Sequence, residues 1–150
     1  MIHKENKMKK INILTLVCAS LIFSSLHAEE QTAEQLVSSK TKADMNYRQL
    51  MEIMGSSSSM IHEGILRENK QMVKTGANFI FTHPAPNHKP WDIMKKEDQS
   101  DFKKSLLAFD KILDIHTENV VASADKENWS DAGNAAHELT NACIACHLLW

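Results

Sequence analysis

The sequence predicts an all-α fold, an antiparallel four-helix bundle around one core. Apolar residues recur at spacings of three and four along most of the chain, as they do on one face of a helix. All three prolines fall between residues 84 and 90. No segment alternates between apolar and polar residues as a half-buried strand would. These observations favour a helical bundle over a fold built on a sheet.

Residues 1–28 are typical of a secretory signal peptide. Four lysines lie among the first ten residues, an apolar run from Ile11 to Leu26 follows, and Ala28 precedes two glutamates. The apolar run is short for a membrane span. We therefore expect cleavage after Ala28, export to the periplasm, and a mature domain of residues 29–150 with no stable membrane insertion. Retention of the segment as an anchor is the alternative, because Leu26 stands where a small residue is usual.

The charge and cysteine content of the mature domain exclude two classes of protein. The signal segment holds four of the 17 basic and one of the 19 acidic residues, which leaves 13 basic and 18 acidic residues. An acidic domain of this kind is not expected to bind nucleic acid. Loss of Cys18 with the signal leaves Cys143 and Cys146, too few for a disulfide framework.

The first helix is predicted from about Thr32 to Arg67. Gly55 and the four serines after it resemble a loop in composition, but the apolar stripe resumes in phase beyond them, so we expect a continuous helix; a break at Gly55 is the alternative. The stripe comprises Leu36, Ala43, Tyr47, Leu50, Met51, Met54, Ser58, Ile61 and Ile65.

The second helix is expected to begin after Asn69 and to end at Thr82, where the prolines start. Residues 82–90 then form a crossover loop, flanked by His83 and His88 as solvated side chains, and Trp91 folds back onto the bundle.

The third helix, from about Ser100, has the seam of a bundle helix. Its seam residues are Phe102, Leu106, Phe109, Leu113, His116 and Val120. The fourth helix begins near Asp125 or Asn128 and has an inner face rich in alanine, which allows another helix or a flat cofactor to come close. That face comprises Ala132, Ala135, Ala136, Leu139, Cys143 and Cys146.

The chemistry of the chain is concentrated in Cys143-Ile144-Ala145-Cys146-His147. C-x-x-C-H is the spacing of c-type haem attachment, in which each cysteine forms a thioether to a vinyl group and the histidine ligates iron. On a helix the three side chains project from the same side. A zinc site would need a fourth ligand, and no other histidine has a paired zinc-ligand spacing with the motif. A thioredoxin-like dithiol would open a helix after a strand. We therefore predict one covalent haem c, with His147 as the proximal iron ligand.

With a signal peptide, four helices and this terminal motif, the chain resembles the class II c-type cytochromes, the cytochrome c′ group and its low-spin relatives. Tyr47-Arg48-Gln49-Leu50-Met51 followed by Gly55 is similar to the family's first-helix signature. The resemblance implies that Met51 faces the iron on the distal side. Met51 comes three residues after Arg48, where the family has four, so Met54 and Glu52 are alternatives. His62, eleven residues beyond Met51, is a competing ligand.

These residues predict a function without catalysis. His147 and Met51 on one haem would make a periplasmic electron carrier that serves redox partner proteins. The alternative is a five-coordinate protein, similar to cytochrome c′, that binds nitric oxide or carbon monoxide. The resemblance also implies a possible homodimer. Arg48, Lys70 and Lys74 are candidate partners for the haem propionates.

Overall fold

The computed structural model describes residues 31–150, and the predicted signal peptide lies outside them. The predicted all-α class is confirmed, since helices account for most of the described residues. None of these helices is long and apolar enough to cross a membrane. In chain order the elements are α1 (Ala33–Ser39), β1 (Lys42–Ala43), α2 (Tyr47–Leu66), α3 (Lys70–Thr82), β2 (Ala85–Pro86), the 3-10 helix η1 (Pro90–Ile93), α4 (Gln99–Asp125) and α5 (Trp129–Leu149).

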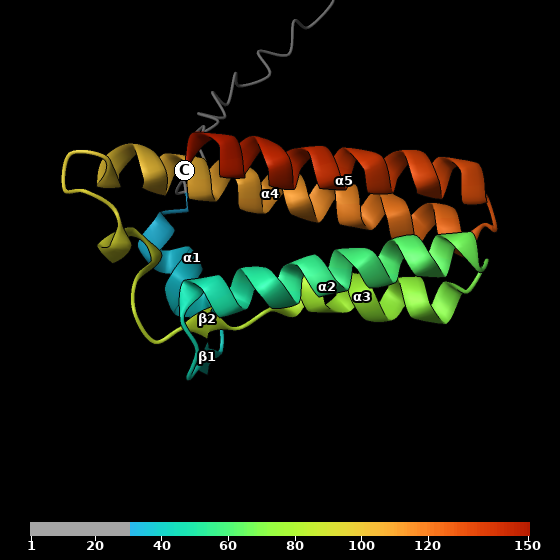
Figure 1. The fold of residues 1–150 in the computed structure, drawn as a ribbon, viewed down its shortest axis with the longest axis horizontal. Helices are drawn as coiled ribbons and strands as arrows, with labels where there is room; N and C mark the ends of the chain where they lie inside the picture. The colour runs from blue at the N-terminus through green and yellow to red at the C-terminus, as the bar shows by residue number, and fades with distance from the viewer. Residues whose placement is uncertain (1–30) are drawn as a thin grey trace, which may run out of the picture.

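The four long helices form two hairpins, α2 with α3 and α4 with α5, which lie side by side with their tight turns at the same end (Figure 1). The turns are built alike. Glu68 and Glu127 adopt left-handed φ values of 52° and 57°, and the asparagine after each caps the next helix through its side chain. A longer connection through β2 and η1 joins the hairpins at the other end.

The predicted first helix is wrong in its first part and right in its second. Two capping boxes explain the difference. Thr32 and Gln35 start α1, and Asn46 and Gln49 start α2, each pair exchanging side-chain and backbone hydrogen bonds. A residue at such an N-cap leaves the helical conformation, so the chain is interrupted between the boxes. There β1 pairs in parallel with β2.

The expectation of a continuous helix through Gly55 is confirmed. The hydroxyls of Ser56, Ser57 and Ser59 each donate to the backbone carbonyl four residues earlier, at 3.0 Å. Their polar groups are therefore satisfied inside the helix instead of competing with it.

The apolar interior has two closed parts. The larger cluster lies toward the hairpin turns and comprises Ile61, Val73, Ala77, Ile80, Val120, Ala124, Ala132, Ala136 and Leu139. The smaller cluster lies at the other end, where α1, β2 and η1 cover α4, and comprises Ala33, Val37, Ala85, Trp91 and Phe102. The burial of Trp91, 4% exposed, confirms that the proline loop folds back onto the helices.

Helices α2 and α3 approach closely because each has a glycine that faces the other helix, Gly64 in α2 and Gly76 in α3. A Cβ added at Gly76 would lie 2.6 Å from the Ser57 carbonyl oxygen and 2.9 Å from Ile61 Cγ1. A Cβ at Gly64 would lie 2.8 Å from the Val73 backbone nitrogen. The hairpin therefore depends on the absence of side chains at these two positions.

We predict that Gly76→Ala lowers the free energy of unfolding by roughly 1–3 kcal/mol, because the added methyl group meets backbone atoms that cannot move aside. Gly133→Ala is the matched control. Its Cβ would meet no atom within 4 Å, so we expect the free energy of unfolding to rise by about 0.5–1 kcal/mol, because alanine favours the helix over glycine. Urea denaturation of both variants measures the difference. Equal stabilities would contradict the packing described here.

Candidate functional site

A cavity of about 280 Å³ lies between α2, α4 and α5, in the interval between the two closed clusters. Its lining is mainly apolar and includes Tyr47, Met51, Met54, Gly55, Ser58, Ile80, Leu106, Phe109, Leu113, Thr140, Ala142, Cys143, Ile144, Cys146 and His147. The predicted α4 seam explains part of this wall. Leu106, Phe109 and Leu113 line the cavity, as their seam positions predict, and are only half-buried.

Helix α5 brings the whole C-x-x-C-H motif to this cavity. Cys143, Cys146 and His147 all line it, as their helical spacing predicts. Both cysteines are half-buried free thiols. Burial raises the pKa of each thiol, so the protonated form is favoured in the folded chain. His147 lies in the last turn of α5 and is the most exposed of the three.

Helix α2 supplies two methionines to the same cavity. Met51 and Met54 both line it and are half-buried. Gly55 lies beside them, where an added Cβ would meet no atom within 4 Å. Glu52 points away, because its exposed carboxylate pairs with Arg48 at 3.1 Å. The structure therefore brings Met51 and Met54 to the motif, and not Glu52.

His62 lies outside the cavity lining. Its Nε2 is 3.1 Å from the Thr140 hydroxyl oxygen, and its side chain is on an exposed part of the α2 surface. The described geometry therefore gives His62 a partner on α5 rather than a place opposite His147.

A smaller cavity, of about 80 Å³, extends the first one. Both are lined by Tyr47, Met51, Met54, Leu106 and Leu113, and the smaller one also by Lys40, His83 and Asp110. Tyr47 lines both cavities. Burial, followed by the charges of Cys146 and Asp110, raises the pKa of its phenol to about 12. The site is thus an apolar space with the motif at one end and a small group of polar side chains at the other.

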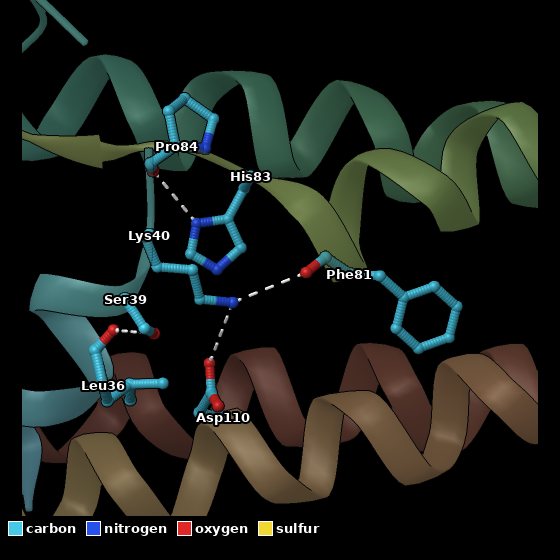
Figure 2. A network of polar contacts seen from close by, with 7 residues as sticks. All are labelled: Leu36, Ser39, Lys40, Phe81, His83, Pro84 and Asp110. Carbon is cyan, nitrogen blue, oxygen red and sulfur yellow. Dashed lines mark hydrogen bonds and ion pairs between the residues drawn. The ribbon is translucent and has the colours of Figure 1, made fainter. Parts of the chain in front are cut away.

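The polar group is drawn in Figure 2. Lys40 Nζ lies 3.8 Å from Asp110 Oδ1 and 3.4 Å from the Phe81 carbonyl oxygen, while His83 Nδ1 is 3.1 Å from the Pro84 carbonyl oxygen. The Lys40 and Asp110 side chains are 17% and 22% exposed. The expectation that His83 is a solvated loop residue is wrong: it is half-buried, and burial lowers its pKa.

Sequence reasoning missed Lys40 and Asp110 as site residues. The signal that could have found Lys40 is the Asn46-x-x-Gln49 capping box, which ends the first helical segment before residue 46 and lets the chain around Lys40 turn inward. The basic residues that the sequence suggested as propionate partners pair with carboxylates outside the cavity. Arg48 pairs with Glu52, whereas Lys70 and Lys74 pair with Glu127 and Asp125 beside the hairpin turns, at 2.9 and 2.6 Å.

Comparison with known proteins adds no relative: no protein-family model, curated protein or solved structure matches this chain. Within residues 31–150, no group of three or more histidine, cysteine, aspartate or glutamate side chains is arranged to hold a metal ion by itself.

We predict that the thiols of residues 29–150, made without haem attachment, react slowly with iodoacetamide. Alkylation requires the thiolate, and burial raises the pKa of both thiols, so the rate falls about tenfold for each unit of the increase. The same chain unfolded in urea at the same pH is the control. Equal rates in the two states would contradict the burial of the thiols.

Proposed function

We propose that this chain is an exported c-type cytochrome that carries electrons through one covalently attached haem. The observation that supports the proposal is the cavity, since it places the C-x-x-C-H turn of α5 and the two methionines of α2 around one apolar space. Cys143 and Cys146 would form the thioethers, His147 would be the proximal iron ligand, and Met51 the distal one. The protein is a carrier rather than an enzyme.

The side chains of the C-x-x-C-H motif fit a covalently attached haem. Two thiols and an imidazole follow one another on a single helix, and all three side chains reach the same apolar space. The buried, alanine-rich face of α5, with Ala132 and Ala136 fully buried, keeps that helix close to its neighbours up to the start of the motif. The arrangement suits an antiparallel four-helix bundle with haem attachment at the C-terminal end of its last helix.

The haem, when bound, supplies one-electron transfer between the ferrous and ferric states. The chain's own residues tune that exchange. The apolar walls from Ile80, Phe109 and Leu113 lower the local dielectric and disfavour the additional positive charge of the ferric state. A methionine sulfur as sixth ligand raises the reduction potential further. Both effects favour a carrier of relatively high potential.

Met51 is preferred to Met54 because of the resemblance of Tyr47-Arg48-Gln49-Leu50-Met51 to the first-helix signature of the class II cytochromes. Both methionines reach the cavity, so their roles are separable by substitution. The competing proposal is a five-coordinate protein in which neither methionine binds iron and the apolar walls leave room for nitric oxide or carbon monoxide.

We predict that the purified ferrous protein has a low-spin visible spectrum that carbon monoxide does not change, because a methionine occupies the sixth position. Met51→Ala should convert it into a high-spin protein that binds carbon monoxide. Visible spectra recorded with and without the gas measure both outcomes.

Met54→Ala is the matched control, since it removes an equal side chain from the same helix and cavity and should leave the spectrum low-spin. A wild-type spectrum that shifts with carbon monoxide would favour the gas-binding protein. A Met51→Ala protein that stays low-spin would assign the sixth ligand to another residue.

Location and partners follow from the same proposal. The segment 1–28 would direct the chain to the periplasm, where haem is attached and where redox proteins act as electron donor and acceptor. A homodimer is part of the proposal only through the family resemblance.

A further inference from the structure

Lys40, His83 and Asp110, which line the smaller cavity, have no role in the function proposed above. A haem is asymmetric: its vinyl groups and its propionates lie on opposite edges of the macrocycle. If Cys143 and Cys146 hold the vinyl edge, the propionate edge is directed away from α5. A role for these residues toward the propionates therefore rests on the proposed function, because it requires a haem attached at Cys143 and Cys146.

The space that leads away from the thiols ends at a lysine. Tyr47, Met51 and Met54 line both the cavity that holds the motif and the smaller cavity that holds Lys40, His83 and Asp110. Among the residues that line either cavity, Lys40 is the sole lysine or arginine. The other basic residues considered, Arg48, Lys70 and Lys74, pair with exposed carboxylates.

The contacts of Lys40 leave it able to accept a further anionic partner. Its side chain is only 17% exposed, and a charge that is largely removed from water is unfavourable unless it is well paired. Its distances to Asp110 Oδ1, 3.8 Å, and to the Phe81 carbonyl oxygen, 3.4 Å, are at the long end for an ion pair and a hydrogen bond. Figure 2 shows the Lys40 and Asp110 side chains pointing toward each other from the end of α1 and from α4, with the His83 ring close to Lys40.

We propose that Lys40 is the positioning residue that binds a propionate of the attached haem. The titratable side chains around this group are Lys40 after α1, Tyr47 from α2, His83 after α3, and Asp110 and Asp114 from α4, while β2 and η1 line the smaller cavity with Ala85, Pro86 and Pro90. Burial, followed by the charge of Asp110, raises the pKa of Asp114. A second carboxylate beside Asp110 is therefore harder to ionise than a free one, and the Lys40 charge would offset that cost for a propionate.

A double-mutant cycle on the haem-loaded protein tests the assignment. The four proteins are the wild type, Lys40→Met, Asp110→Asn and the double variant, with Lys74→Met as a control for loss of a paired surface lysine. The midpoint potential of each is measured as a function of pH, and resonance Raman spectra record the propionate bending band. Loss of Lys40 should raise the pH of the propionate ionisation by roughly one to three units, lower the midpoint potential, and shift the bending band.

The two backgrounds separate a haem role from a purely structural one. If Lys40 binds the propionate, its removal changes the pH profile and the bending band in the Asp110→Asn background as well. If the change occurs only while Asp110 is present, or in neither background, Lys40 serves Asp110 alone and the inference is overturned. Lys40→Gln, which keeps a donor for the Phe81 carbonyl, replaces Lys40→Met if that variant does not fold. A wild-type protein without covalent haem would refute the proposed function itself, which is a separate outcome.

Discussion

The close packing of the alanine face of α5 is the constraint on which the candidate site depends. Ala132 and Ala136 have no exposed surface, and Leu139 is 1% exposed, so this half of α5 packs directly against its neighbours. Helical periodicity then decides where the next turns point. Cys143, Cys146 and His147 follow in the same register, and they meet a cavity where the preceding residues meet side chains.

The cavity lies between the two apolar clusters, and different contacts hold the helices together at each of them. On one side the hairpin turns and the close contact of Gly64 and Gly76 hold α2 against α3. On the other side α1, β2 and η1 cover α4 through the cluster around Trp91 and Phe102. Lys103 strengthens this cover, because its ammonium group lies 4.6 Å from the centre of the Trp91 ring and pairs with Glu34. Three seam residues of α4 that line the space between these regions, Leu106, Phe109 and Leu113, are only half-buried, although the core-facing positions of a bundle helix are usually buried.

The sequence was sufficient to predict features that depend on local periodicity. The helical class, the continuity of α2 through Gly55 and the inward direction of Cys143, Cys146 and Met51 follow from spacings of three and four. The ends of α3 follow from the Asn69 cap and the prolines after Thr82. Two features were not predicted because they depend on long-range contacts. The Asn46 capping box signals the break in the first helix locally, but the pairing of Lys42 and Ala43 with Ala85 and Pro86 joins segments far apart in the chain. The approach of Lys40 to Asp110 does the same. Similarly, Arg48, Lys70 and Lys74 are close to the site along the chain but face exposed carboxylates in the fold.

Extraction of the denatured protein tests most directly whether Cys143 and Cys146 hold a haem covalently, as we propose. The protein is produced in a cell that attaches haem to C-x-x-C-H motifs, unfolded, and extracted with acidified acetone; Cys143→Ser/Cys146→Ser is the control. We expect the colour to stay with the wild-type polypeptide, whose mass increases by one haem, and the control to remain colourless. Colour that passes entirely into the solvent, or a wild-type chain with no haem at all, would contradict it.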